Sequence, residues 1–110
     1  MNKDMVEIIN VEADTQEIYD ALPVIAEGEV WKIKSFGACD INIGDHKSSF
    51  YLLKWGNVNV CPISLTGNTI EIPIDRDFTG DSVKKFTIVY KNNSSSAKNL
   101  AFWIRATKRN

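Results

Sequence analysis

The sequence predicts an all-β fold, a single antiparallel β-sandwich of the jelly-roll type with about eight strands in one domain over residues 1–110. Apolar side chains recur at every second position in most segments, which is the period of a strand with one buried face. Polar stretches rich in Gly, Asp, Asn and Ser separate these segments, as expected of antiparallel strands joined by turns. In such a fold the binding residues lie on loops and outer faces.

The N-terminal segment contains two predicted strands, and the second of them is ambiguous. Residues 5–12 are rich in apolar side chains, which predicts a first strand. Over residues 15–22, either Asp14 or Thr15 caps a short helix, or the alternation of Ile18 with polar neighbours continues as a strand. We favour a strand, because a helix this short has little stability of its own.

The third predicted strand, over residues 29–36, follows a glycine turn at Gly28. Trp31, Ile33 and Ser35 share one parity and lysines lie between them, so the face that carries these three residues is expected to be buried. The same argument places three more residues in the core with Trp31 and Ile33, namely Ile72, Ile88 and Phe102. Further strands are expected near residues 49–55, 58–63, 68–74, 84–91 and 99–107.

Length and hydropathy exclude several classes of protein. The 110 residues are enough to bury a core in one domain. Apolar runs are much shorter than the roughly 20 residues that cross a bilayer, and Met1–Asp4 opens no apolar signal segment. We therefore expect no membrane partner and synthesis in a cytoplasm, where Cys39 and Cys61 are reduced thiols.

The sequence offers no catalytic residue, no cofactor site and no zinc site. The net charge of −1 and the pI of about 5.8 lack the basic footprint of nucleic-acid binding. The chain has a single histidine, His46, and no Gly-x-Ser-x-Gly elbow, and neither cysteine has an evident base. Zinc has too few ligands. We therefore expect a protein that is not an enzyme and does not bind nucleic acid.

The loop predicted over Asp75–Ser82 is the best candidate for a metal site. Asp75 and Asp77 match the start of an EF-hand loop, but Phe86 occupies the position where the bidentate glutamate belongs. No metal ligand is therefore assigned. A calcium site of another type, built from Asp75, Asp77 and Asp81, stays open beside the simpler interpretation of a solvated turn with Asx hydrogen bonds.

Charge is unevenly distributed along the chain. Residues 1–29 carry eight acidic side chains and one lysine, whereas residues 84–110 carry seven basic side chains and no acidic one. Either the terminal strands pair within one chain and their charges compensate, or complementary faces meet between subunits. The second interpretation predicts an interface of Arg105, Lys108 and Arg109 with Glu12, Asp14 and Glu17.

Two tryptophans are candidates for an exposed face. Trp55 precedes Gly56 at a predicted strand end, and Trp103 alternates with Phe102 and its apolar neighbours. Exposed rings on a sandwich stack on sugars or become buried at a subunit interface, and the enrichment of aromatic residues at interfaces favours the second role. We predict that Trp55 and Trp103 lie at subunit contacts, with carbohydrate binding as the alternative.

Several short motifs occur in order between residues 25 and 107. They are Glu-Val-Trp-Lys-Ile after a glycine turn, Leu-Lys-Trp-Gly at 53–56, Thr-Gly-Asn at 66–68 before Ile-Glu-Ile-Pro at 70–73, Gly-Asp at 80–81, and Tyr-Lys-Asn at 90–92 before a serine-rich turn. In these motifs the chain resembles small β-sandwich structural proteins of tailed bacteriophages, of the capsid decoration and tail accessory types. Members often carry a second glycine after Gly-Asp, where this chain has Ser82.

The resemblance implies a virion protein that is assembled in the bacterial host cytoplasm, often as a homotrimer, and that contacts other virion proteins such as the major capsid protein. The leading hypothesis is therefore a non-enzymatic decoration or head accessory protein that self-associates and binds the particle surface. The alternative is a carbohydrate-binding or receptor-binding tail module that recognises host glycans. A third class, a small hydrolase, needs two carboxylates about 5 to 10 Å apart in a cleft.

Overall fold

The computed structural model describes residues 4–22, 24–40, 49–65 and 69–109. Within these residues the chain forms strands and no helix, so none of the described segments is a helix long and apolar enough to cross a membrane. The all-β prediction is confirmed. The strands are β1 (Met5–Val11), β2 (Thr15–Asp20), β3 (Val30–Asp40), β4 (Ser49–Trp55), β5 (Val58–Leu65), β6 (Thr69–Thr79), β7 (Phe86–Asn92) and β8 (Lys98–Lys108).

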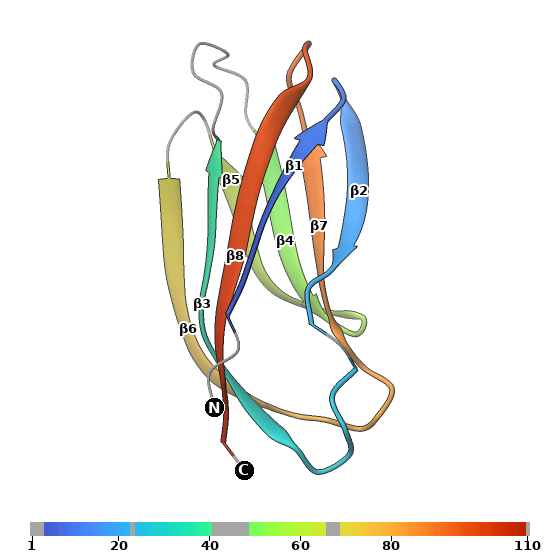
Figure 1. The fold of residues 1–110 in the computed structure, drawn as a ribbon, viewed down its shortest axis with the longest axis vertical. Helices are drawn as coiled ribbons and strands as arrows, with labels where there is room; N and C mark the ends of the chain where they lie inside the picture. The colour runs from blue at the N-terminus through green and yellow to red at the C-terminus, as the bar shows by residue number, and fades with distance from the viewer. Residues whose placement is uncertain (1–3, 23, 41–48, 66–68, 110) are drawn as a thin grey trace.

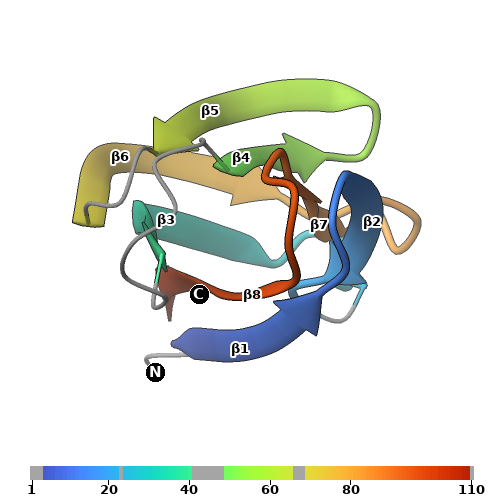
Figure 2. The same cartoon turned by 90° about the horizontal axis from the view of Figure 1, so that it is seen from above.

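The strands form two antiparallel sheets that pack as the layers of a sandwich (Figures 1 and 2). One sheet has the order β1-β8-β3-β6 and the other has the order β2-β7-β4-β5. The first strand therefore pairs with the last and the second with the seventh, which is the nested order of a jelly roll. The molecule is elongated, 45 × 22 × 18 Å, and the strands follow its long axis.

The ambiguous segment after residue 14 is a strand, as favoured from the sequence. Asp14 takes a left-handed φ of 53° in the turn between β1 and β2, a conformation that aspartate tolerates better than most residues. β2 then pairs with β7, with Tyr19 opposite Ile88. Pairing with β7 therefore explains why this segment is a strand, because a helix would leave the hydrogen-bonding groups on that edge of β7 without partners.

Strands β3 and β6 are longer than the sequence pattern indicates, and β3 is irregular. A bulge between Ile33 and Ser35 shifts the parity of β3, so Ile33 and Phe36 both face the core. Ser35 is buried, as expected, at 5% exposed, but it pairs with the exposed Arg105, so the expectation that it shares the inner face of Trp31 is wrong. The loop expected over residues 75–82 is also wrong in part, because β6 continues to Thr79 and pairs there with Val30.

The core lies between the sheets and is rich in aromatic rings. Ile33, Ile88 and Phe102 are fully buried and Trp31 is 7% exposed, so the predicted core positions are confirmed, with Ile72 partly buried at the margin. Phe102 packs against three tyrosine rings, and a second aromatic group fills the other half of the core. The tyrosines of the first group are Tyr19, Tyr51 and Tyr90.

The turn that follows β6 contains a serine in a strained backbone conformation. Ser82 takes a left-handed φ of 62°, the region that favours glycine. Its backbone N–H donates to the carbonyl of Ile25 at 3.0 Å, and its Oγ accepts the backbone N–H of Glu27 at 2.8 Å. These two hydrogen bonds offset the strain and fasten the turn to the segment that precedes β3.

Candidate functional site

The outer face of the β1-β8-β3-β6 sheet carries the most distinctive group of exposed side chains. In β8, Phe102 and Ile104 point into the core, so the alternation of the strand places Trp103 on the outer face. The strand register then sets one row across the sheet, in which Trp103 lies between Val6 of β1 and Gly37 of β3. Glu71 of β6 ends this row, because it is opposite Gly37.

Gly37 makes room for the indole ring of Trp103. A Cβ atom at position 37 would lie 2.1 Å from Cε2 of Trp103, a separation that real atoms do not adopt. The ring therefore occupies the space directly over the backbone of β3, with its position fixed by a residue that has no side chain. Any larger residue at position 37 must displace the ring.

Polar contacts fix the edge of the same ring. The indole Nε1–H of Trp103 donates to Oε1 of Glu71 at 3.0 Å, and Arg105 Nη2 lies 3.5 Å from the same oxygen. The hydrogen bond from Trp103, with the nearby charge of Arg105, holds the pKa of Glu71 below its usual value. Glu71 is therefore a carboxylate at neutral pH, and it bridges the ring and the guanidinium.

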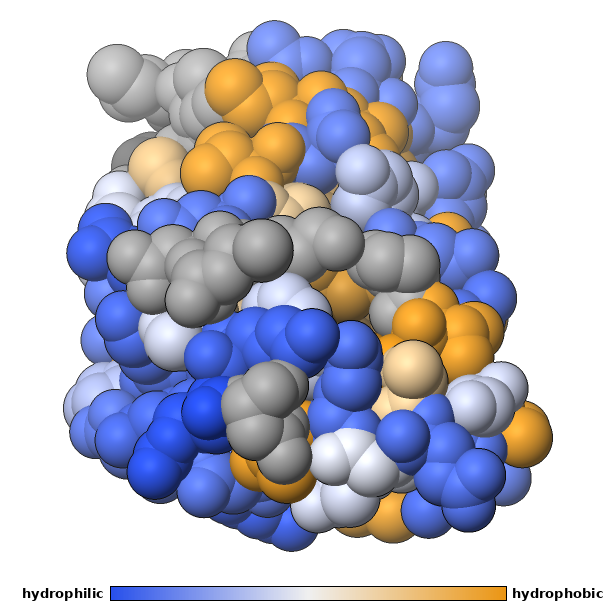
Figure 3. Space-filling model, turned by 60° about the horizontal axis from the view of Figure 1, so that its bottom comes forward, coloured by the Kyte–Doolittle hydropathy of each residue, from blue (hydrophilic) through white to orange (hydrophobic). Residues whose placement is uncertain are grey.

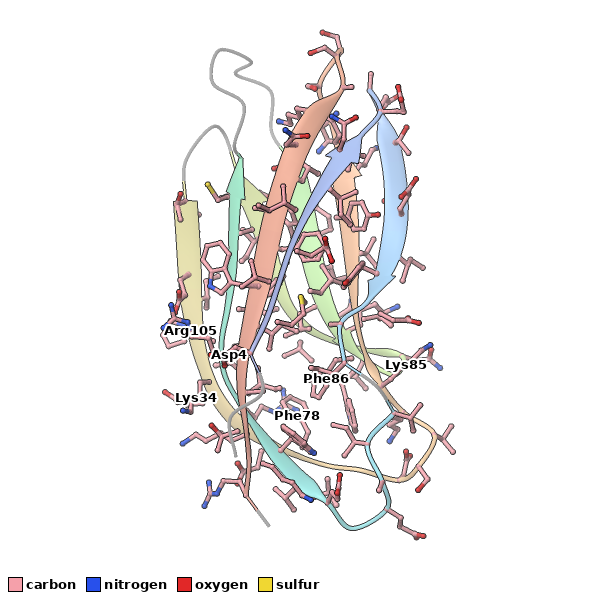
Figure 4. All side chains as sticks on the ribbon, in the orientation of Figure 1. Asp4, Lys34, Phe78, Lys85, Phe86 and Arg105 are labelled. Atoms are coloured by element: carbon pink, nitrogen blue, oxygen red, sulfur yellow. The ribbon has the colours of Figure 1, made fainter. Side chains whose placement is uncertain are left out.

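Aliphatic side chains surround this ring on the side of β1. Val6 is 69% exposed and Ile8 is 58% exposed, both on the outer face of the edge strand. A shallow hollow of about 230 Å³ lies between Asp4, Val6, Trp103 and Arg105. Figure 4 labels Asp4 near the start of β1 and Arg105 at β6. We call Val6, Ile8, Glu71, Trp103 and Arg105 the Trp103 face.

Exposed apolar side chains also occur away from the Trp103 face, among them Val58 and Val83, which are 50% and 76% exposed. Figure 3 shows the lower end of the molecule as mostly hydrophilic, with separate hydrophobic patches between the polar residues. A larger hollow, about 460 Å³, is lined here by residues that include Val83, Asp81 and Lys84. Its one carboxylate is already used, because Asp81 Oδ1 accepts the backbone N–H groups of Val83 and Lys84 at 2.9 and 2.7 Å.

The hydrogen bond between Trp103 and Glu71 predicts a pH response. The folded pKa of Glu71 lies below 4.5, its ordinary value, so the stability that this carboxylate contributes is complete above 4.5 and is lost as the pH falls through the folded pKa. We expect the fluorescence of Trp103, obtained as the difference between wild type and Trp103→Phe, to change with a midpoint below 4.5. Glu71→Gln keeps an acceptor and should abolish the transition. A midpoint above 4.5 would contradict the contact.

Of the two tryptophans predicted at an interface, the structure places only Trp103 on the surface. Trp55 is 8% exposed and packs against Phe86 and Phe78 with ring centroids 4.5 and 5.6 Å away, so the prediction that it lies on an exposed face is wrong. Figure 4 shows Phe78 and Phe86 in the lower half of the molecule. The cause is parity, because Trp55 follows Tyr51 and Leu53 on the inner face of β4.

The charged residues predicted at an interface lie in two places that are far apart. Val11 pairs with Lys98 at one end of β8, whereas Trp31 pairs with Lys108 at the other end. The structure therefore does not bring the acidic group near residues 12–17 together with the basic group near residues 105–109 in one chain.

Each group has partners of its own within the chain. Lys108 Nζ lies 2.8 Å from Glu29, Arg109 Nη1 lies 3.4 Å from Asp77, and Arg105 contacts Glu71. In the acidic group, Asp14 lies 3.8 Å from Lys91, and Glu17 accepts the hydroxyl hydrogen of Tyr90 at 2.7 Å, whereas Glu12 is exposed. Acidic side chains of the first 29 residues thus form ion pairs with basic side chains of the last 27 residues within one chain. This agrees with the interpretation that the charges compensate within the chain.

The three aspartates of the candidate calcium site do not converge. Asp75 lies 3.9 Å from Lys32, Asp77 pairs with Arg109, and Asp81 binds backbone N–H groups of its own turn. Within the described residues no three His, Cys, Asp or Glu side chains lie close enough to hold a metal ion. The reason is that Asp75 and Asp77 belong to strand β6 rather than to a loop, which separates them from Asp81.

Two cysteines and one histidine complete the residues considered from the sequence. Cys39, which is half-buried, and Cys61, which is buried, are both free thiols in different sheets. Burial raises the pKa of the Cys61 thiol, which makes it a poor nucleophile. His46 lies outside the described residues.

Sequence reasoning missed most of the Trp103 face. Glu71 and Gly37 were not singled out, because the row that joins them depends on the pairing of strands distant in the sequence. The exposure of Val6 and Ile8 was missed because β1 contains apolar residues on both parities. That Val6 lies next to Trp103 becomes evident only when β1 is known to pair with β8.

Comparisons with known proteins show the fold. No protein-family model matches the sequence, and no curated protein matches it. A solved structure of the Bacillus endospore appendages, described as disulfide-linked pili, has a TM-score of 0.54 at 11% identity, over 97% of this chain and 87% of that one. The N-terminal cellulose-binding domain of the Cellulomonas fimi β-1,4-glucanase C has a TM-score of 0.50 at 12% identity, over 96% and 80%.

A third solved structure is much larger than this chain. The insecticidal delta-endotoxin Cry8Ea1 from Bacillus thuringiensis has a TM-score of 0.51 at 10% identity, and the likeness covers 94% of this chain and 20% of the toxin chain. The chain thus spans about a fifth of the toxin's length. At these identities the likenesses show a shared β-sandwich fold, which occurs in pilus, carbohydrate-binding and toxin proteins alike.

Proposed function

We propose that the chain is a non-enzymatic structural subunit of a tailed-phage virion, a decoration or head accessory protein that self-associates and binds the particle surface. One observation carries the proposal. Val6 and Ile8 expose most of their surface beside Trp103, on a sheet face that the described residues leave uncovered. Exposed apolar groups of this kind mark interaction sites, since a monomer gains nothing from keeping them in water.

The composition of the Trp103 face fits a protein interface. A tryptophan lies near the middle, aliphatic side chains lie on one side, and the paired charges of Glu71 and Arg105 lie on the other. Interfaces share this arrangement, with aromatic and aliphatic anchors at the centre and paired polar groups at the rim. Gly37 and Glu71 hold the ring in place before binding, which lowers the entropy lost on association.

The described hollows offer little support for an enzyme. General acid or base catalysis needs a titratable group that is open to substrate and has a pKa near the working pH. In the larger hollow, the backbone N–H groups of Lys84 and Val83 lower the pKa of Asp81. In the smaller hollow, Asp4 Oδ1 accepts the backbone N–H of Ala106 at 3.4 Å. Both carboxylates already make contacts that stabilise the fold.

The proposal is tested on the virion itself and on the isolated protein. Purified particles of the phage that encodes the chain should contain it in stoichiometric amounts, and their major capsid protein should retain it in pull-down experiments. Because the charged side chains pair within the chain, we expect association to change little between 0.1 and 1 M salt, where screened charge contacts would weaken. Absence of the chain from purified particles would overturn the proposal.

Glycan binding is the second candidate, and Trp103 is the observation that favours it. A fixed indole ring flanked by Glu71 and Arg105 offers a surface for stacking and polar groups for sugar hydroxyls. The cellulose-binding domain that shares the fold is supporting context. A glycan array probed with the wild type, Trp103→Ala and Gly37→Ala separates the candidates. Binding by the wild type that both variants lose would replace the assembly proposal.

A further inference from the structure

Strand β1 is the least protected edge of the sandwich. Four strands lie at sheet edges, and Figure 2 shows β1 at the outer end of its sheet. Proteins guard such edges with proline, with charged side chains or with irregular backbone. Edge strand β5 has Pro62, β6 has Pro73 and a left-handed Asp75, and β2 has the exposed Glu17. β1, with the sequence Met-Val-Glu-Ile-Ile-Asn-Val, has one charged residue and no proline.

The backbone of β1 has hydrogen-bonding groups directed away from its neighbour β8. The N–H of Ile8 donates to Oε1 of the adjacent Glu7 side chain at 3.3 Å, rather than to the β8 ladder. In an antiparallel strand the N–H and C=O groups of alternate residues point to the same side. The groups of Val6 and Asn10 therefore share the free edge with those of Ile8.

We infer that β1 pairs with β1 of a second copy of this chain, antiparallel across a two-fold axis and with Ile8 opposite Ile8; this specifies the contact of the self-association proposed above. In this register the free-edge groups of Ile8 meet those of the second Ile8, and Val6 meets Asn10. Every residue of the seven-residue strand finds a partner. The contact is isologous, as a two-fold axis requires, and it brings the two exposed Ile8 side chains together at its centre.

Charge and strand length disfavour the two neighbouring registers. A pair centred on Ile9 would use only residues 7–11 of the seven-residue strand. A shift that centres the pair on Glu7 places two carboxylates directly opposite each other, which destabilises a strand pair. With Ile8 at the centre, Glu7 faces Ile9 of the second copy. On pairing, Glu7 Oε1 loses the hydrogen bond from the N–H of Ile8. Glu7 Oε2 keeps the hydrogen bond from the hydroxyl of Tyr19, which is 2.7 Å long in the single chain.

The pairing joins two sheets into one continuous sheet and covers part of the Trp103 face. Val6 and Ile8 gain apolar and polar neighbours from the second copy, because their side chains lie on the same outer face of the joined sheet. The two Trp103 rings remain on that face and stay available to a particle surface. A two-fold contact makes a dimer the elementary unit, in place of the trimer that the resemblance implies.

Proline at position 8 tests the hydrogen bonds of the contact. The N–H of Ile8 takes no part in the β8 ladder, so Ile8→Pro leaves the pairing inside the chain intact and removes one donor from each copy. We expect the dimer dissociation constant to rise by about 100-fold, since two hydrogen bonds are lost and each contributes about a tenfold factor. Circular dichroism verifies that the variant is folded.

A charged pair of variants tests the same contact without proline. Ile8→Lys should dissociate the dimer, because the two lysines meet across the axis. The control is Ile18→Lys, which changes an isoleucine that is 67% exposed on the other edge strand, β2, and should leave the dimer intact. Ile8→Glu should also be monomeric alone, and a mixture of Ile8→Lys with Ile8→Glu should pair again.

Cysteine at position 8 tests the register. Residues opposite each other in a strand pair lie within disulfide reach, so Ile8→Cys should form a covalent dimer on mild oxidation. The wild type, oxidised in the same way, measures any cross-linking through the native thiols of Cys39 and Cys61. Val6→Cys should not cross-link to itself but should cross-link to Asn10→Cys. Cross-linking of Ile8→Cys no stronger than that of the wild type would overturn the register.

The outcomes separate this inference from the proposed function. An oligomer that is insensitive to Ile8→Pro and Ile8→Lys overturns the β1 pairing and leaves the structural role standing. A chain that is monomeric in solution but present in particles likewise overturns the β1 pairing and leaves the structural role standing. A chain that is monomeric and absent from particles overturns the structural role, and the pairing falls with it.

Discussion

Replacing Trp55 with alanine is expected to lower the free energy of unfolding by about 3 to 5 kcal/mol, the range for truncating a large buried aromatic side chain. Trp55 is 8% exposed and lies within 4.5 Å of the Phe86 ring and 5.6 Å of the Phe78 ring, measured between centroids. Alanine leaves a cavity beside these rings and removes the two tilted ring contacts of Trp55. Urea unfolding monitored by circular dichroism measures the loss.

Trp103→Ala is the matched control, because it makes the same chemical change on the outer face. Its indole is half-buried and rests over Gly37, so we expect a distinctly smaller loss of stability than at Trp55. Binding to the particle surface should respond in the opposite order, with Trp103→Ala weakening it more than Trp55→Ala does. Equal stability losses in the two variants would contradict the placement of Trp55 in the core.

Replacing Asn92 with alanine is expected to cost about 2 to 4 kcal/mol, because buried carbonyl groups lose their donor. Asn92 is fully buried, and its Nδ2 donates to the carbonyls of Val11 and Ser96, both at 2.9 Å. Its Oδ1 accepts the backbone N–H and the hydroxyl of Ser94 at 2.9 and 2.6 Å. The side chain thus ties the end of β1 to the turn between β7 and β8.

Asn93→Ala is the control for Asn92, since the neighbouring amide is half-buried. We expect Asn93→Ala to change the thermal midpoint much less than Asn92→Ala does. Asn92→Asp should be at least as harmful as Asn92→Ala, because it replaces the donor with a buried charge that faces carbonyl oxygens. If Asn92→Ala melts within error of the wild type, the buried network does not contribute as described.

The fold followed from the sequence because strand alternation is local. β4 and β1 were located closely, and the short second strand was assigned correctly against a helix. What failed depended on distant pairing. The bulge after Ile33 reverses the parity of β3 at Ser35, and the extension of β6 through Asp77 is stabilised by pairing with β3 rather than by its own polar sequence.

The site could be predicted less well than the fold. Trp103 was expected on an outer face because it alternates with core residues, and this argument is local. Trp55 was misplaced because a strand-end position was weighed above its parity with Leu53. The partners of Trp103 come from β1, β3 and β6, and no sequence pattern gives the order β1-β8-β3-β6 that brings them into one row.

The mass of the isolated protein in solution tests the central claim most directly. Light scattering across a wide concentration range, with Ile8→Pro measured in parallel, should give twice the 12.4 kDa of one chain for the wild type and a single chain for the variant. The wild-type mass should stay the same between 0.1 and 1 M salt. A wild type of 12.4 kDa at every concentration, together with particles that lack the chain, would contradict a self-associating structural subunit.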